Sequence, residues 1–178
     1  MTESARSFAI NAHGDQLYGI NPYTVHLHDV VSRVAQANDT VLNPEYLQNV
    51  AWLHDVLEDT SVTFNELQSA FGYWVAGSVS IITDPSFLPS RKERKAHANR
   101  AFKLLDPERI THRAALIVKT ADRLANIRYS KAVENKGKLK MYRKEHPEFE
   151  AATRREGLVP AYWDRMQIDL GLINPSNS

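Results

Sequence analysis

The chain has 178 residues, enough for one domain with a continuous hydrophobic core. Its 22 Lys and Arg residues against 21 Asp and Glu leave a net charge of +1, which argues against general binding to nucleic acid. The absence of cysteine excludes disulfides, a thiolate nucleophile and a cysteine-based zinc site, so any bound metal needs His, Asp and Glu ligands.

The N-terminal residues lead into no apolar core of the kind found in signal peptides. No run approaches the roughly 20 apolar residues that a membrane-spanning helix needs. We therefore expect a soluble cytoplasmic protein that forms one domain over residues 1–178 and has neither a membrane nor a nucleic acid as its partner.

The first half of the chain predicts helices. Asn21-Pro22 and Asn43-Pro44 each combine a capping Asn with a Pro suited to the first helical position. Thr63 and Glu66 form a capping box, and Gly72 is a helix-stop signal. The expected helices cover residues 2–13, about 22–37, 43–57 and 63–72.

The second half is also helical in pattern. Residues 73–83 are apolar and expected to be buried, and residues 84–89 are expected to form a loop. The basic stretch Arg91–Lys95 opens a helix that Asp106-Pro107 ends. The clearest helical periodicity then covers 114–127, and after a loop at 131–138 two helices follow over about 139–156 and 160–170. Because no repeat and no alternating strand pattern occurs, the predicted fold is all-α.

Four polar residues follow an apolar run at residues 50–60. His54 precedes Glu58 by four positions, and Asp55 precedes Asp59 by four, so on a helix or its last turn they share one side. Three carboxylates and an imidazole at one place are costly unless a cation or a substrate offsets them. The alternative is a helix C-terminus whose acids are solvated.

Two further polar residues, His26 and Asp122, lie on otherwise apolar helical faces. With His54 and Asp55 they would offer two imidazoles and two carboxylates, a set that suits Mn²⁺, Fe²⁺ or Zn²⁺ with positions left for water. Taken singly, Asp122 could instead pair with a basic residue or His26, and His26 could be an ordinary core or surface residue.

Glu58 and Asp59 lie one helical turn beyond the candidate ligand pair. That spacing suits a general base that holds or deprotonates a water molecule on the metal. A solvated helix end remains the alternative for both residues. Four other histidines are expected to be ordinary surface residues: His28, His97, His112 and His146.

Across most of its length the chain resembles the HD-superfamily phosphohydrolases, specifically the RelA/SpoT-type hydrolase fold and its stand-alone small alarmone hydrolases. The order and spacing of several segments carry the resemblance. They are Ala12-His13-x-x-Gln16, Pro22-Tyr23-x-x-His26, Leu53-His54-Asp55-x-x-Glu58-Asp59-Thr60, Thr63, Phe71-Gly72-x-x-Val75-Ala76, Thr83-Asp84, Glu93-Arg94-Lys95 and Val118-Lys119-x-Ala121-Asp122-Arg123-Leu124-x-Asn126-x-Arg128.

The resemblance implies that a Mn²⁺ ion, or another divalent transition metal, is held by His26, His54, Asp55 and Asp122. It implies that Glu58 and Asp59 are the catalytic pair for removal of a 3′-pyrophosphate from a (p)ppGpp-like nucleotide. Asn126 matches a position that contacts the nucleotide sugar. Lys119 and the basic helix start Arg91–Lys95, with Arg91 and Lys92 as its first residues, match positions suited to phosphate contacts, although a solvated charged helix end is an equal alternative for Arg91–Lys95.

The chain departs from the family pattern at Tyr18, where an Arg that packs on the purine base is usual, and at Leu27, where Pro is usual. A Tyr18 ring could stack on a base but offers no guanidinium to guanine, so the base stays open. The alternatives are a phosphohydrolase acting on dNTPs, NMPs or NADPH, and a non-catalytic nucleotide-binding module. No synthetase-like second domain is expected.

Overall fold

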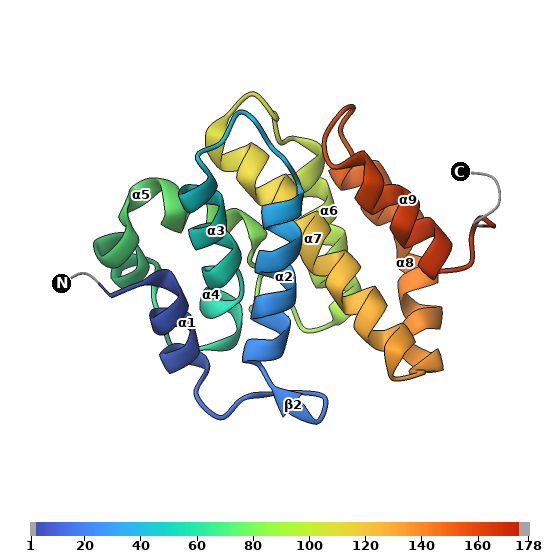
Figure 1. Ribbon diagram of the computed structural model, residues 1–178, viewed down its shortest axis with the longest axis horizontal. Coiled ribbons are helices and arrows are strands. Elements are labelled where there is room, and N and C mark those ends of the chain that lie inside the picture. The colour runs from blue at the N-terminus through green and yellow to red at the C-terminus, as the bar shows by residue number, and fades with distance from the viewer. Residues whose placement is uncertain (1–2, 175–178) are drawn as a thin grey trace.

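The computed structural model describes residues 3–174, and within that range the chain is helical apart from one short β-hairpin (Figure 1). The prediction of an all-α fold is confirmed. Residues 1–2 and 175–178, which include the first position of the predicted 2–13 helix and the ends of the predicted domain, lie outside the described residues. The elements in chain order are α1 Ala5–His13, β1 Leu17–Tyr18, β2 Asn21–Pro22, α2 Thr24–Gln36, α3 Pro44–Leu53, α4 Val56–Asp59, α5 Phe64–Ile82, α6 Arg91–Lys103, α7 Ile110–Ala132, α8 Lys136–Thr153 and α9 Pro160–Asp169.

The long helix α7 runs through the middle of the molecule (Figure 1). It packs against α2, α3 and α5 on one side and against α8 and α9 on the other. All its residues from Ala114 to Ala121 are buried, which is the pattern of a helix enclosed by others. Polar residues on α7 are therefore held firmly, because the helix that carries them is fixed by packing on both sides.

The hydrophobic core has two parts. The larger part joins α1, α2, α3, α5 and α7, and the smaller part lies between α7, α8 and α9 around the fully buried Trp163 and Met166. Leu124 and Ile127 on α7 contribute to the smaller part. Both sides of α7 are thus anchored by burial of apolar area, which is the main stabilising contribution to a fold of this kind.

Local capping signals place two helix starts as predicted. The Asn43 side chain accepts hydrogen bonds from the backbone N–H groups of Glu45 and Tyr46 at the start of α3. At the start of α5, the Thr63 hydroxyl accepts from the Glu66 N–H, and the Glu66 carboxylate accepts from the Thr63 N–H. These contacts satisfy backbone donors that the first helical turn leaves without partners.

The start predicted for the second helix is wrong. Asn21 and Pro22 form strand β2, which pairs antiparallel with Leu17 and Tyr18, and helix α2 begins two residues later at Thr24. The residue before a proline favours an extended backbone, so the same two residues serve a strand as readily as a helix start. The hairpin decides between these outcomes, and no residue-by-residue signal reveals it.

The helix stop predicted at Gly72 is present as an interruption, because Gly72 has a non-helical φ of 82° and ψ of 165°. A second helical segment follows directly across this kink, so α5 as a whole extends to Ile82. Past the kink Tyr73 and Trp74 are 62% and 60% exposed, which contradicts burial of the whole 73–83 stretch.

Near the C-terminus two more predictions need correction. The loop expected at 131–138 is shorter, because α7 extends to Ala132 and α8 begins at Lys136, capped by the Asn135 side chain. His146, expected on the surface, is buried next to Trp163, since it lies on the face of α8 that packs on α9.

Candidate metal centre and active site

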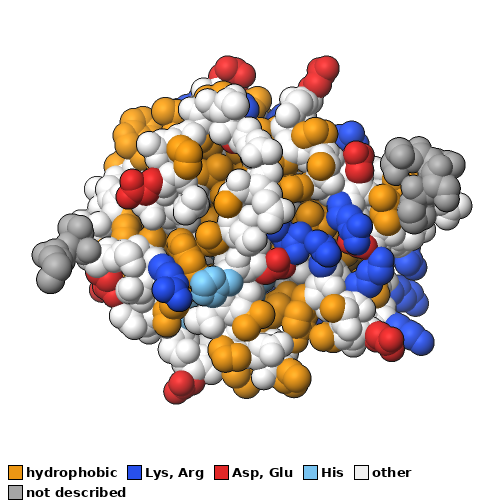
Figure 2. Space-filling model, viewed as in Figure 1, with side chains coloured by type: hydrophobic (Ala, Val, Ile, Leu, Met, Phe, Trp, Pro, Cys, Tyr) orange, Lys and Arg blue, Asp and Glu red, His pale blue; other side chains and the backbone are white. Residues whose placement is uncertain are grey.

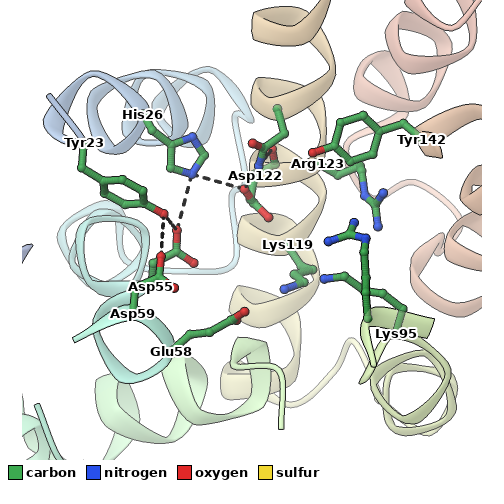
Figure 3. A pocket seen from close by; sticks show the side chains of 12 residues that line it. Tyr23, His26, Asp55, Glu58, Asp59, Lys95, Lys119, Asp122, Arg123 and Tyr142 are labelled. Carbon is green, nitrogen blue, oxygen red and sulfur yellow. Dashed lines mark hydrogen bonds and ion pairs between the residues drawn. The ribbon is translucent and has the colours of Figure 1, made fainter. Parts of the chain in front are cut away.

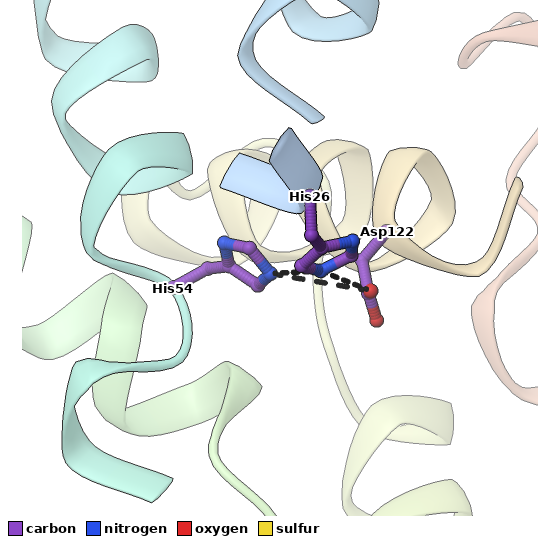
Figure 4. A group of neighbouring side chains, drawn as sticks. All are labelled: His26, His54 and Asp122. Carbon is purple, nitrogen blue, oxygen red and sulfur yellow. Dashed lines mark hydrogen bonds and ion pairs between the residues drawn. The ribbon is translucent and has the colours of Figure 1, made fainter. Parts of the chain in front are cut away.

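Three helical elements bring His26, His54 and Asp122 together. His26 comes from α2, His54 follows the last residue of α3, and Asp122 comes from the middle of α7, with one potential ligand atom of each within 4.8 Å of the others (Figure 4). The Nε2 atoms of the two histidines are 3.2 Å apart, and the Asp122 Oδ1 lies 3.3 Å from His26 Nε2 and 4.0 Å from His54 Nε2.

The end of α3 sets the direction of the His54 ring. His54 is fully buried, and its Nδ1 lies 2.8 Å from the Ala51 carbonyl oxygen, which can only accept a hydrogen bond. Nδ1 therefore carries the proton, and in the neutral ring Nε2 presents its lone pair toward His26 and Asp122. A backbone partner of this type is the usual support of a metal-binding histidine.

Asp55 lies beside this group in the turn between α3 and α4. Its Oδ2 is 3.0 Å from His54 Nε2 and 3.5 Å from His26 Nε2. The same oxygen accepts a hydrogen bond of 2.5 Å from the Tyr23 hydroxyl (Figure 3). All four residues that the sequence predicts as ligands thus meet in one place.

The charges of the four residues are strongly coupled. Burial lowers the pKa of His26, but the carboxylates of Asp122 and Asp55 outweigh that effect and raise it to about 10. Burial raises the pKa of Asp122, and the neighbouring His26 lowers it to about 2. The carboxylates thus stay ionised in the interior and call for positive charge, which a divalent cation supplies in place of protons.

The donor set fits a metal of the transition series. Two imidazole nitrogens and two carboxylates from converging elements match the ligands of Mn²⁺, Fe²⁺ and Zn²⁺ sites. The position of His54 is the observation that carries the fit, since its Nδ1 is held by the Ala51 carbonyl oxygen and its Nε2 lies 3.2 Å from the His26 Nε2. The group formed by His26, His54 and Asp122 can hold a metal ion.

The acids of α4 lie at the same opening. Asp59 Oδ2 accepts hydrogen bonds from the Tyr23 hydroxyl at 3.0 Å and from the Gln16 side-chain amide at 3.2 Å. Glu58 Oε2 accepts a hydrogen bond of 3.1 Å from the backbone N–H of Asp84. Desolvation raises the pKa of Glu58, although nearby Lys119 opposes the shift. A carboxylate with a raised pKa is suited to accepting a proton.

Opposite these acids, basic side chains from α6 and α7 point into the same pocket (Figure 3). Lys119 is buried and donates to the Ile82 carbonyl oxygen, and Asp84 lies 2.5 Å from the Lys95 Nζ and 3.8 Å from the Lys119 Nζ. Desolvation and the nearby Lys119 lower the pKa of Lys95, while Asp84 opposes the shift.

Arg91 and Arg123 complete the basic side. Both bind Glu145 of α8, Arg91 through its Nε at 2.9 Å and Arg123 through its Nη1 at 2.8 Å. Arg123 also lies over the Tyr142 ring, with its guanidinium carbon 5.0 Å from the ring centre. These contacts hold the two guanidinium groups at the pocket, where they face the metal group.

The structure brings most of the predicted site residues to this pocket, but not all. Arg91, Lys119 and Asn126 line it, as do the predicted acids and three of the four predicted ligands: Glu58, Asp59, His26, Asp55 and Asp122. The fourth ligand, His54, is fully buried and does not line it, and Lys92 is exposed outside it. Tyr18 does not line the pocket either and instead contacts Asn126 from behind.

Sequence reasoning missed several lining or supporting residues. Tyr23 and Arg123 belong to segments that carry the family resemblance, but the sequence assigns neither a role in the pocket. Lys95 lies within the basic stretch Arg91–Lys95 that the resemblance links to phosphate contacts, and the structure brings it to the pocket together with Arg91, four positions before it on the same face of α6. The missed residues are Tyr23, Asp84, Arg123, Tyr142 and Glu145.

Within the described residues, no helix has the length and apolar character that crossing a membrane requires. An all-helical architecture with a His-Asp group at its centre is the arrangement that the sequence resemblance predicts. Comparison with known proteins shows which proteins share it.

No family model matches the chain. The MESH1 guanosine-3′,5′-bis(diphosphate) 3′-pyrophosphohydrolase of Danio rerio is 34% identical over 124 residues, which make up 68% of this chain and 64% of that protein. The guanosine-3′,5′-bis(diphosphate) 3′-pyrophosphohydrolase of Spiroplasma citri is 33% identical over 125 residues, 69% of this chain but 16% of that protein. The chain therefore spans less than two thirds of the length of either relative.

Solved structures agree on the fold. The structure of a metazoan ortholog of SpoT that hydrolyses ppGpp superposes with a TM-score of 0.78 at 23% identity, covering 95% of this chain and 94% of that one. A Listeria monocytogenes protein matches with a TM-score of 0.59 at 21% identity over 83% of this chain and 92% of its own. The resemblance to RelA/SpoT-type hydrolases, predicted from the sequence motifs, is confirmed.

Proposed function

We propose that the protein is a metal-dependent hydrolase that removes the 3′-pyrophosphate from (p)ppGpp-like nucleotides. The observation that carries the proposal is the pairing, across one pocket, of a two-His, two-Asp group with the basic side chains of Arg91, Lys95, Lys119 and Arg123. A pyrophosphate carries several negative charges, so it would satisfy the basic side while one of its oxygens reaches the metal. The names of the relatives with which the chain aligns support the same chemistry.

His26, His54, Asp55 and Asp122 would hold the ion, and we propose Mn²⁺ as the physiological metal. When bound, a divalent ion supplies Lewis acidity to a phosphoryl oxygen and lowers the pKa of water. The residues of the chain do the rest of the work, which is to orient the substrate, to accept a proton and to stabilise charge on the phosphoryl oxygens.

Glu58 and Asp59 would act as the catalytic pair. Their carboxylates lie on α4, one turn beyond Asp55, and both accept hydrogen bonds that hold them in place. The raised pKa of Glu58 suits it to take the proton from the attacking water. Asp59, held by Tyr23 and Gln16, would orient that water through its second oxygen.

The basic side would bind the pyrophosphate that leaves and the phosphates at the other end of the nucleotide. Asp84 pairs with Lys95 and Lys119, and its backbone N–H binds Glu58. The two lysines therefore lie on the Glu58 side of the pocket and would contact the reacting phosphoryl group. Arg91 and Arg123 lie farther along toward α8 and would bind the remaining phosphate. Lys92 is not part of this proposal because its side chain is exposed outside the pocket.

A second candidate keeps the fold and changes the nucleotide. Tyr18 is engaged with protein side chains and offers no polar group to a guanine base, which favours a phosphohydrolase with relaxed base preference. Other nucleotides such as ppApp, NADPH, dNTPs or NMPs are its candidate substrates. A non-catalytic binding module is disfavoured because the whole set of metal-binding and acidic positions is present.

The test is incubation of the purified protein with Mn²⁺ and a panel of ppGpp, pppGpp, ppApp, NADPH, dNTPs and NMPs, followed by chromatographic separation of the products. Release of pyrophosphate from the 3′ position is the expected result. Release of phosphate or pyrophosphate only from NADPH or dNTPs supports the second candidate instead. If the protein binds the metal but turns over none of these substrates, the non-catalytic nucleotide-binding module is the function that remains.

A further inference from the structure

Tyr18, at the second position of strand β1, lies against the metal group without lining the pocket. Its ring stands 4.7 Å from the His26 ring and 4.2 Å from the Tyr129 ring, measured between centres, with interplanar angles of 32° and 41°. Both neighbours therefore pack on the Tyr18 ring.

The Tyr18 hydroxyl binds Asn126, and through it reaches a candidate metal ligand. Tyr18 Oη lies 2.9 Å from Asn126 Oδ1, and Asn126 Nδ2 donates to the Asp122 carboxylate at 2.5 Å and to the Asp122 carbonyl oxygen at 3.1 Å. An ionised carboxylate only accepts, so the amide must turn its NH₂ to Asp122 and its oxygen to Tyr18. Tyr18 is consequently the donor that completes this orientation.

The hairpin that carries Tyr18 is also fixed to α7 at Tyr129. The Tyr129 hydroxyl donates to the Tyr18 carbonyl oxygen at 3.1 Å, and the Asn21 amide lies 3.4 Å from the same hydroxyl. At Gly19, where φ is 66°, a Cβ would stand only 2.1 Å from the Tyr129 hydroxyl oxygen. The outer side of the hairpin faces solvent, because Leu17 and Ile20 are 63% and 91% exposed.

We propose that Tyr18 is a positioning residue of the metal site: its ring holds the imidazole of His26, and its hydroxyl holds Asp122 through Asn126. The proposal rests on the proposed function only in that the His-Asp group binds a divalent ion. The hairpin then serves to preorganise the metal ligands, and Tyr18 is not among the residues that contact the nucleotide. Asn126 uses one of the two acceptor sites of its amide oxygen for the bond from Tyr18.

Metal affinity measures this role directly. The metal-free protein is titrated with Mn²⁺ by calorimetry, for the wild type and for Tyr18→Phe, which keeps the ring, and Tyr18→Ala, which removes it. Partners of metal ligands are typically worth 10–100-fold in affinity. We expect about a threefold to tenfold weaker affinity for Tyr18→Phe, since one hydrogen bond is lost, and about 10–100-fold for Tyr18→Ala.

Matched controls separate positioning from general stability. Ile20→Ala changes an exposed residue of the same hairpin, and Tyr46→Phe removes a tyrosine hydroxyl whose 2.6 Å bond to Ser78 lies away from the metal group. Both controls should bind Mn²⁺ like the wild type, and thermal unfolding of the metal-free proteins reports any loss of stability. An effect on the melting temperature alone, without a change in Mn²⁺ affinity, would contradict the positioning role.

A double-mutant cycle tests the path through Asn126. Asn126→Leu and Tyr18→Phe should weaken Mn²⁺ binding less than additively when combined, because both remove the same support of Asp122. Wild-type affinity in Tyr18→Phe and Tyr18→Ala overturns the inference while the metal site stands. Absence of saturable Mn²⁺ binding in the wild type overturns the metal assignment and this inference together. Mn²⁺ binding that depends on Tyr18, without release of pyrophosphate from any alarmone, leaves the inference and removes the proposed function.

Discussion

The two sides of the pocket hold their charges in opposite ways. On the metal side, carboxylates outnumber the cations near them, and the histidines between them can supply charge only by binding protons. On the basic side, each cation already has a protein partner, since Asp84 lies between two lysines and Glu145 between two arginines. The metal side thus favours an added cation that takes the place of protons on the histidines, whereas the basic side is stable by itself and has positive charge left over for an anion.

The difference predicts different consequences for substitution. Removing a ligand on the metal side eliminates the ion and with it the chemistry, because no neighbouring residue can replace a missing ligand. Removal of one cation on the basic side leaves three others, so binding weakens by a finite factor. The following predictions take the expected effects from the largest to the smallest.

The largest effect is expected from Asp122→Ala and His54→Ala. Each should abolish Mn²⁺ binding in calorimetry and lower hydrolysis of ppGpp by more than about 10³-fold, since the reaction loses its Lewis acid. Asp164→Ala, which alters an exposed acid of α9, is the control and should leave both properties unchanged. Full activity of either ligand variant in the presence of a chelator would contradict the assignment.

Next in size is Glu58→Gln, which keeps the shape and the hydrogen bond from Asp84 but cannot accept a proton. Mn²⁺ affinity should persist while kcat falls by about 10²–10⁴, the usual contribution of a general base. Glu108→Gln, at an exposed site before α7, serves as the control. If the Glu58 variant loses the metal instead, its carboxylate is a ligand or a structural group.

The pH dependence sharpens the same assignment. A general base works in its ionised form, and desolvation raises the pKa of Glu58. We therefore expect kcat/KM to rise with pH through a limb that lies above the ordinary range of a Glu carboxyl. That limb should disappear in Glu58→Gln, as measured by initial rates from pH 4 to 8. A limb that stays in the variant would belong to another group.

A smaller effect is expected on the basic side, where Lys95 and Lys92 form a matched pair. Lys95→Met should lower kcat/KM for ppGpp about 10–100-fold, because a charged contact to phosphate is lost. Lys92→Met should have no measurable effect, since its side chain lies outside the pocket. Steady-state rates of the two variants test this difference. An equal loss of kcat/KM in both variants would show that the charge of the whole helix start acts on the substrate at a distance.

The smallest effect on activity is expected from Asp169→Asn, far from the pocket. Its buried carboxylate binds Lys131 and Arg165 at 2.8 Å each, at the end of the molecule where Figure 2 shows basic side chains gathered. Loss of these charged hydrogen bonds should destabilise the protein by about 2 kcal/mol in urea unfolding. Activity at 25 °C should stay unchanged.

The pH dependence of stability follows from the same carboxylate. Desolvation raises the pKa of Asp169, but hydrogen bonds from Lys131 and Arg165 outweigh it and lower the pKa below the ordinary value. This group therefore stabilises the fold above the pKa of an unfolded Asp, and the contribution is lost as the pH falls through the lowered folded value. The difference in stability between the wild type and Asp169→Asn should accordingly shrink in acid.

Much of the fold was predictable because its signals are local. The caps at Asn43 and Thr63 act within one helical turn, and the structure has each of them at a helix start. Predictions that depended on distant partners were wrong. The Asn21-Pro22 pair joined a hairpin that is docked by Tyr129, more than 100 positions along the chain, and His146 was buried by α9.

For the candidate site, the sequence by itself determined which residues could bind a metal and which acids follow them, because those residues share segments with fixed helical spacing. It could not determine which of the basic residues at 91–95 face the pocket. The rotation of α6 about its axis is set by burial of Ala98 and Phe102, and that rotation turns Arg91 and Lys95 inward and leaves Lys92 outside. Tertiary structure decided this, since the energy that fixes a helix in rotation comes from the apolar area it buries against its neighbours.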